Sequence, residues 1–170
     1  NAEKLNTTQG DPATYTPELW KWMVTSLSLS SMLDVGCGEG HTAAIFRSLG
    51  CRVCGVDGSS RALRDSVIPD AHLIHDYTLG PFSPGADYDL VWSCEFVEHV
   101  EPRFVNHFLT TFSAATRYLF MTAAPPGQPG WHHVNCQPES YWIRLLETIG
   151  FYYDAALTRS ARSKAESGHF

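Results

Sequence analysis

Three glycines at alternate positions in the segment Asp34-Val-Gly-Cys-Gly-Glu-Gly40 constrain the fold of this chain more than any other feature. They lie between an apolar segment, 31–36, that is typical of a strand and a segment, 41–49, with the apolar spacing of a helix. Because glycine has no Cβ, the backbone there can turn tightly and approach a ligand closely. The motif therefore predicts a binding site where a strand of an open α/β sheet ends.

Apolar segments and helical patterns alternate along the rest of the chain. The expected strands are 31–36, 51–57, 71–77, 88–94, 117–124 and 151–157, and the expected helices are 41–49, 59–68, 101–115 and 139–148. Strands separated by helices predict an α/β fold with a doubly wound, mostly parallel, Rossmann-like sheet and helices on both faces.

The length of 170 residues suits a single domain over 1–170 with one sizeable core. Within it we expect 1–30 to form a cap with one helix, and the polar segment 159–170 to be a mobile tail. No apolar run approaches the roughly 20 residues of a membrane-spanning helix, and the first residues resemble no secretion signal. We expect a cytoplasmic protein that does not enter membranes.

Five cysteines, an odd number, indicate reduced thiols. Cys51 and Cys54 form a C-x-x-C pair, which leaves a redox or metal-binding pair as an alternative. They lie in an expected strand, however, and residues three apart on a strand point to opposite faces. We therefore expect the two thiols to diverge.

Asp57 ends the second expected strand, 21 residues after Gly36. An acidic residue at this place can accept hydrogen bonds from ribose hydroxyls, so the two features together indicate an adenosine cofactor. A nicotinamide or flavin dinucleotide remains an alternative, but its loop reads G-x-G-x-x-G, whereas this loop reads G-x-G-x-G and continues with His41.

The loop resembles that of the class I S-adenosylmethionine (SAM)-dependent methyltransferases, D/E-x-G-x-G-x-G, and the segment 88–100, YDLVWSCEFVEHV, resembles the fourth strand and turn of ubiquinone-type members. This resemblance implies SAM as the cofactor and S-adenosylhomocysteine (SAH) as the product. It places Asp34, Gly36, Gly38 and Gly40 around the methionine part, Asp57 and Gly58 at the ribose, Asp76 and Tyr77 at the adenine, and Ser93, Cys94 and Glu95 near the sulfonium. Asp76 could instead be a loop acid or a helix cap.

The pattern Glu95-x-x-Glu98-His99 resembles the metal-binding segment of ubiquinone-biosynthesis O-methyltransferases and of small-RNA 3′-terminal 2′-O-methyltransferases. In the latter, a further histidine follows strand five, where this chain has His132 and His133. Glu95, Glu98, His99 and His133 are thus candidate ligands of a divalent metal, and this donor set suits Mn²⁺, Fe²⁺, Co²⁺ or Zn²⁺ better than Mg²⁺. The alternative is local hydrogen bonding without metal, in which case His99 or His133 is a candidate catalytic base.

The resemblance implies an enzyme that transfers a methyl group from SAM to an oxygen or nitrogen atom of a small-molecule, sugar or lipid-precursor acceptor. A metal-dependent RNA 2′-O-methyltransferase is the first alternative, although a net charge of −6 disfavours binding to nucleic acid. A SAM-binding partner subunit without catalysis is the second. Trp131, Tyr141 and Trp142 are candidate acceptor contacts, although the helical spacing of Trp142 with Leu145 and Leu146 favours a place in the core for Trp142. Family members have a further antiparallel strand that we do not find in this sequence, so we expect it to be missing from this chain.

Overall fold

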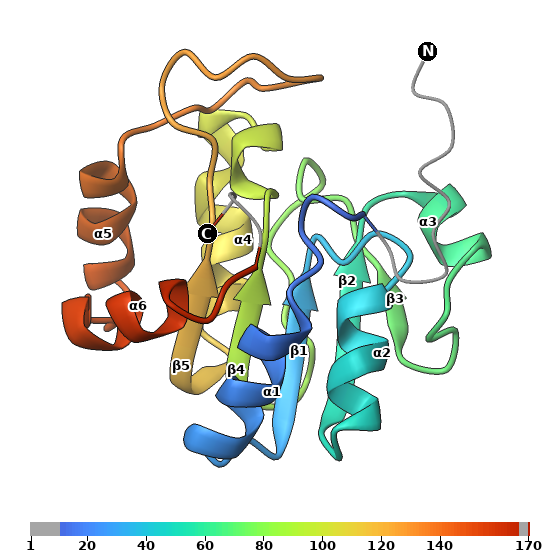
Figure 1. The fold of residues 1–170 in the computed structure, drawn as a ribbon. Helices are drawn as coiled ribbons and strands as arrows, with labels where there is room; N and C mark the ends of the chain where they lie inside the picture. Colours follow the sequence, from blue (N-terminus) through green and yellow to red (C-terminus); the bar gives the residue numbers. More distant parts are fainter. Residues whose placement is uncertain (1–10, 167–169) are drawn as a thin grey trace.

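A five-stranded, fully parallel sheet organises the described part of the chain, which is residues 11–166 and 170 of a computed structural model. The strand order is β3-β2-β1-β4-β5, with β1 paired to both β2 and β4 (Figure 1). The strands are β1 (Ser31–Val35), β2 (Arg52–Asp57), β3 (His72–Ile74), β4 (Tyr88–Ser93) and β5 (Ala115–Met121). The chain reverses its direction of winding between β1 and β4, and such a point is where open α/β sheets bind ligands.

Helices cover both faces of this sheet, which confirms the predicted fold class. They are α1 (Pro17–Ser26), α2 (His41–Ser48), α3 (Ser60–Arg64), α4 (Val105–Phe112), α5 (Glu139–Glu147) and α6 (Ala155–Arg162), with short 3-10 helices η1 (Val97–His99) and η2 (Pro102–Phe104). One apolar layer joins the sheet to α1, α2 and α6, and the other joins it to α4 and α5.

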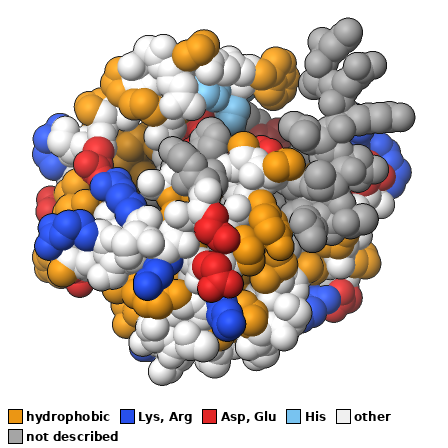
Figure 2. All heavy atoms as spheres, viewed as in Figure 1, with side chains coloured by type: hydrophobic (Ala, Val, Ile, Leu, Met, Phe, Trp, Pro, Cys, Tyr) orange, Lys and Arg blue, Asp and Glu red, His pale blue; other side chains and the backbone are white. Residues whose placement is uncertain are grey.

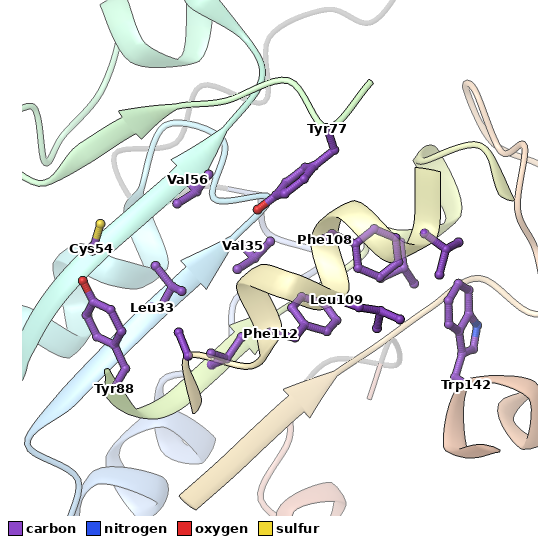
Figure 3. Packing of buried hydrophobic residues seen from close by; sticks show 14 residues of the cluster. Leu33, Val35, Cys54, Val56, Tyr77, Tyr88, Phe108, Leu109, Phe112 and Trp142 are labelled. Carbon is purple, nitrogen blue, oxygen red and sulfur yellow. The ribbon is translucent and has the colours of Figure 1, made fainter. Parts of the chain in front are cut away.

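The layer beneath α4 shows how the sheet is held (Figure 3). Phe108 and Phe112 are fully buried, and Phe108 packs against Trp142 of α5 at a ring distance of 6.4 Å. Trp142 is therefore a core residue rather than an acceptor contact. Cys54 belongs to this layer and Cys51 to the opposite one, as the strand periodicity predicted, and both are free thiols.

The expected strand over 151–157 was wrong. Residues 151–154 are irregular and α6 follows, because the side chain of Asp154 accepts hydrogen bonds from the backbone N–H groups of Ala156 and Leu157 and caps a helix there. The aromatic run that suggested a strand is largely exposed, with 87% of the Tyr152 side chain open to solvent. Among the described residues, β5 is consequently the edge of the sheet beyond β4.

Several other elements are shorter than expected. Helix α3 ends at Arg64, although Ser59 caps it as predicted by accepting from the N–H of Ala62. The predicted helix over 101–115 divides into η2 and α4.

The segment beyond α6 contacts the start of α1. Glu166 accepts a hydrogen bond from the N–H of Glu18, and its own N–H donates to the hydroxyl of Thr16. Residues 167–169 of the expected tail and the first ten residues of the expected cap lie outside the described residues. Among the described helices, none combines the length and the apolar character that crossing a membrane requires.

Candidate active site

The glycine loop connects β1 to α2 and is shaped by close packing. Gly36, Gly38 and Gly40 have φ angles of +78°, +52° and +85°, which side chains other than glycine rarely adopt. A Cβ at Gly36 would lie 2.5 Å from the ring of Phe96, and one at Gly40 would lie 2.5 Å from Ile68. Glycine is thus required at these two positions for both conformation and space.

Asp57 holds this loop from the neighbouring strand. Its Oδ2 accepts a hydrogen bond from the N–H of Gly38 at 2.9 Å, and its Oδ1 accepts from the N–H of Ser59 at 2.8 Å. Gly58 lies beside it, where a Cβ would contact the carbonyl oxygen of His75 at 3.4 Å. The carboxylate that ends β2 therefore sits directly against the glycine loop.

A pocket of about 360 Å³ lies against the loop, which contributes Gly36, Cys37 and Gly38 to its lining. Its described acidic lining residues are Asp11, Asp34, Glu39 and Glu95, and the lining that the structure describes contains no Lys or Arg. His41, also in this lining, lies 3.1 Å from the carboxylate of Glu39. This pocket has the electrostatic character that a cationic ligand requires.

Asp34 lies at the floor of the pocket and is 3% exposed. Burial first, and then the negative charge of Asp57, raise the pKa of this carboxyl from 3.8 to about 7, against the opposing effect of a backbone hydrogen bond. The site thus holds two neighbouring carboxyl groups whose ionised forms repel each other.

Other residues expected to contact the cofactor have structural partners. Ser93 is fully buried and donates to the carbonyl oxygen of Val35, so its side chain joins the ends of β1 and β4. Tyr77 is buried and donates to Thr111. Asp76 accepts from the N–H of Thr78, and hydrogen bonds from Thr78 lower the pKa of Asp76.

Glu95 adopts a left-handed conformation, with φ at +51°, at the end of β4. Its N–H donates to Oγ1 of Thr122 at 2.9 Å, and that hydroxyl donates to Oε1 of Glu95, also at 2.9 Å. Thr122 follows β5. Its contact with Glu95 was not predicted from the sequence, because nothing there distinguishes Thr122 from the other threonines. The pair fixes a carboxylate on the pocket wall.

A cluster of possible metal ligands lies on the continuation of this segment. One ligand atom each from Glu98, His99 and His133 lies within 4.8 Å of the others. The rings of His99 and His133 are 5.1 Å apart and nearly perpendicular. The structure thus brings together three of the four predicted ligands, while Glu95 is outside this group and bonds to Thr122.

Polar atoms in this cluster are buried without hydrogen bonds. They include both carboxylate oxygens of Glu98, which is fully buried, and Nδ1 of His99. Burial is the main cause that raises the pKa of Glu98, and the carboxylate of Glu95 adds to it. Burial, followed by the charge of His133, lowers the pKa of His99. A cation placed among the buried oxygens of Glu98 and the ring nitrogens of His99 and His133 would offset the loss of their contacts with water.

Two backbone hydrogen bonds hold the loop after β5 against this cluster. The N–H groups of Val134 and Asn135 both donate to the carbonyl oxygen of Glu98, at 2.9 and 3.0 Å. These two hydrogen bonds bring His133 close to His99, which lies 34 positions earlier in the sequence. Figure 2 shows histidine side chains (pale blue) at the surface near the upper edge of the view, where this loop lies.

The family model described as "Methyltransferase domain" matches residues 33–119, about half of the chain, and covers both the glycine loop and the Glu95–His99 segment. The chain belongs to this methyltransferase family. Its loop, its acid at the end of β2 and its sheet order are those of a class I, SAM-dependent member.

Curated relatives of this methyltransferase domain include proteins named ubiquinone biosynthesis O-methyltransferase. The one from Rhodopseudomonas palustris (strain BisB5) is 34% identical over 82 residues, which is 45% of this chain and 32% of the relative. The one from Bradyrhizobium sp. (strain ORS 278) is 37% identical over 79 residues, which is 44% of this chain and 31% of the relative. The matches thus span about a third of the relatives' length.

Solved structures of methyltransferases share its fold. The magnesium protoporphyrin IX methyltransferase of Synechocystis PCC 6803 with bound SAH superposes with a TM-score of 0.62 at 20% identity, over 79% of this chain and 70% of that one. A SAM-dependent methyltransferase from Archaeoglobus fulgidus gives a TM-score of 0.58 at 19% identity, over 80% and 69%. These likenesses confirm the class of fold.

Proposed function

We propose that this methyltransferase domain transfers the methyl group of SAM to a hydroxyl oxygen of a small-molecule acceptor. The glycine loop and the acid-lined pocket support SAM, and the name of the curated relatives supports oxygen as the target atom. SAM carries its own activated leaving group, so the task of the protein is to align the acceptor oxygen, the methyl carbon and the sulfur.

The proposed cofactor position uses the residues on either side of the glycine loop. Asp34, with Gly36, Gly38 and Gly40, surrounds the methionine part, where the acidic lining favours both the α-amino group and the sulfonium. Asp57 and Gly58 lie at the ribose. We place Asp76 and Tyr77 toward the adenine and Ser93 and Glu95 toward the sulfonium, with Tyr77 and Ser93 acting through their backbone because their hydroxyls are engaged elsewhere.

The position of Glu95 is the observation that carries the proposal. Its carboxylate lines the pocket, and three residues further along the chain Glu98 begins the histidine cluster. A cofactor bound in the pocket and an acceptor bound at the cluster would therefore both border the short segment 95–98. Such a juxtaposition is what methyl transfer between two bound molecules needs.

We propose further that Glu98, His99 and His133 hold a divalent metal ion. The buried, unpartnered oxygens of Glu98 and Nδ1 of His99 fit a cation, and one carboxylate with two imidazoles suits Mn²⁺, Fe²⁺, Co²⁺ or Zn²⁺. When bound, such an ion supplies a Lewis acid beside the acceptor hydroxyl. Without a metal, His99 and His133 are the groups placed to accept the acceptor's proton.

Cofactor binding tests the first proposal. We expect wild-type protein to bind SAM and to release SAH from an acceptor pool, and Asp57→Ala to weaken SAM binding by about 1–3 kcal/mol through lost charged hydrogen bonds. Isothermal titration calorimetry and labelled SAM measure both. Asp65→Ala, which removes a surface carboxylate at the end of α3, is the matched control and should bind SAM normally. SAM binding without any transfer would instead indicate a non-catalytic partner subunit.

Metal binding can be measured without methyl transfer. Titration with Co²⁺, followed by its visible absorption, should detect one site, and His133→Asn should weaken binding by more than about tenfold. His132→Asn changes the adjacent histidine, which is outside the cluster, and asparagine tolerates its left-handed conformation. Equal Co²⁺ affinity in the two variants would contradict the metal proposal.

A further inference from the structure

The first turn of helix α1 is capped by a residue from a distant part of the chain. The N–H of Glu18 donates to Oε2 of Glu166 at 3.0 Å, across 148 positions of sequence. The N–H of Glu166 in turn donates to Oγ1 of Thr16, the N-cap residue of α1, at 3.1 Å. Two reciprocal bonds of this kind commonly join residues three apart at the start of one helix. Here they join α1 to the segment that follows α6.

The carboxylate of Glu166 suits this position. Pro17 opens the helix and has no N–H, so the N–H of Glu18 is the first one that needs an acceptor. A negative charge at a helix N-terminus is also favourable. Thr16 is fully buried, whereas Glu166 is exposed to solvent. The contact can therefore open from the side of Glu166 without disturbing the core.

The residues that come just before this cap border the candidate cofactor pocket. The lining of the pocket includes Asp11, Thr14 and Tyr15 together with residues of the glycine loop. Figure 1 shows this segment (dark blue) at the end of the sheet toward which the strand arrows point. We call residues 11–15 the strap, because they form one wall of the pocket and lead directly into α1.

The strap is joined to the start of α1 by its own contacts. The N–H groups of Ala13 and Thr14 donate to the side chain and to the carbonyl oxygen of Asp11, at 2.9 and 3.1 Å. The ring of Tyr15 meets that of Trp20 edge-on at 5.5 Å, and Trp20 is buried and lines the same pocket. A residue that holds the first turn of α1 in place therefore also holds the strap.

We propose that Glu166 is a positioning residue for the cofactor, because by capping α1 it holds the strap against the pocket and slows the release of SAM and SAH. The inference rests on the function given above, since it takes the acid-lined pocket as the place of the cofactor. Glu166 is outside the described lining of that pocket and acts through Thr16 and Glu18. Opening of such a covering segment commonly controls how fast a product leaves an enzyme.

The test measures SAH release directly. Stopped-flow tryptophan fluorescence after dilution of the SAH complex gives the release rate, since Trp20 and Trp92 line the pocket. Glu166→Ala should raise this rate and the Kd for SAH by about fivefold, the effect of losing one helix cap. The KM for SAM should rise with them, while kcat stays at or above its wild-type value. Glu166→Gln keeps an oxygen that can accept from Glu18 and should restore most of the SAH affinity.

Asp89→Ala is the matched control. Like Glu166, Asp89 accepts backbone N–H bonds from a distant segment, those of Ser30 and Ser31 at 2.7 and 3.1 Å, but at the starts of β1 and β4, away from the pocket. It should lower stability and leave SAH release within about twofold of wild type.

Two results would overturn the inference: an SAH release rate in Glu166→Ala equal to that of wild type, or the same acceleration in Asp89→Ala. Either would leave the proposed function standing. Failure of wild type to bind SAH would overturn both. Faster SAH release in Glu166→Ala alone, in a protein that transfers no methyl group, would keep the inference and contradict the proposed function.

Discussion

The glycine loop and the loop after β5 both border the candidate site, but they are held in place by different means. In the glycine loop, the three glycines themselves adopt the positive φ angles of the turn, and Asp57 of the adjacent strand holds it through the N–H of Gly38. The loop after β5 is joined to a distant segment by the carbonyl oxygen of Glu98, which accepts two of its N–H groups. The comparison teaches that the turn of the first loop has a signal in its own glycines, whereas the position of the second loop depends on a contact with a distant segment that has no such signal.

The largest expected effect comes from adding one methyl group to each loop. Gly36→Ala should lower the free energy of unfolding by about 2–4 kcal/mol, because it combines an unfavourable positive φ with a 2.5 Å contact to Phe96. Gly127→Ala has a similar φ of +86° but open space around the Cβ, so it should cost only about 1–2 kcal/mol. Urea unfolding of both variants measures the difference, and equal losses would show that packing does not distinguish the two loops.

A second prediction concerns the buried carboxyl behind the glycine loop. The pKa of Asp34 is raised to about 7 in the fold, so the folded state keeps a proton that the unfolded state releases above pH 4. Stability from this group is complete below about pH 4 and is lost as the pH rises to about 7. Cofactor-free Asp34→Asn should thus gain stability over wild type by a few kcal/mol at pH 8 and by much less at pH 4.5.

Asp89 provides the opposite case for the same measurement. Hydrogen bonds from Ser30 lower the pKa of Asp89, so Asp89→Asn should destabilise the protein at pH 8. Thermal unfolding across this pH range compares the two variants. If Asp34→Asn were no more stable than wild type at pH 8, the carboxyl would be ionised in the fold without penalty.

The smallest effects belong to surface ion pairs on the two sides of the molecule. Arg47 on α2 makes two parallel hydrogen bonds to Asp70, both 3.1 Å, whereas Arg162 on α6 makes one, also 3.1 Å, to Glu139. Arg47→Ala should cost up to about 1 kcal/mol and Arg162→Ala a few tenths, and 1 M salt should reduce both losses. A larger loss for Arg162→Ala in urea unfolding would mean that this pair organises α5 and α6.

The central strands of the sheet could be predicted from the sequence because they are buried between two layers of helices. Strands β1, β2 and β4 agree with their predicted ranges to within about one residue at each end, since strands buried on both faces give continuous apolar segments. The segment 151–157 misled because its aromatic residues favour a strand, while the helix signal rests on Asp154 alone. Helix capping decided the structure there.

The candidate site was predictable in part for a related reason. The glycines and acidic residues around the loop can be recognised in the sequence. Few residues other than glycine tolerate a positive φ, and only Asp or Glu supplies a carboxylate at the end of a strand. The meeting of Glu98 and His99 with His133 was expected only from family resemblance, and the role of Thr122 in fixing Glu95 has no signal in the sequence. Contacts of this kind depend on how two strand ends are placed side by side.

The tryptophan residues of this protein lie in environments of different exposure, so their intrinsic fluorescence can report ligand binding. Trp20 and Trp92 are buried and line the acid-lined pocket, whereas the side chain of Trp131 is exposed in the loop after β5. Buried and hydrated indoles emit at different wavelengths, so a single fluorescence spectrum should register filling of the pocket at its blue side and covering of the outer loop at its red side. The order in which two molecules arrive could then be followed in real time without attaching a dye.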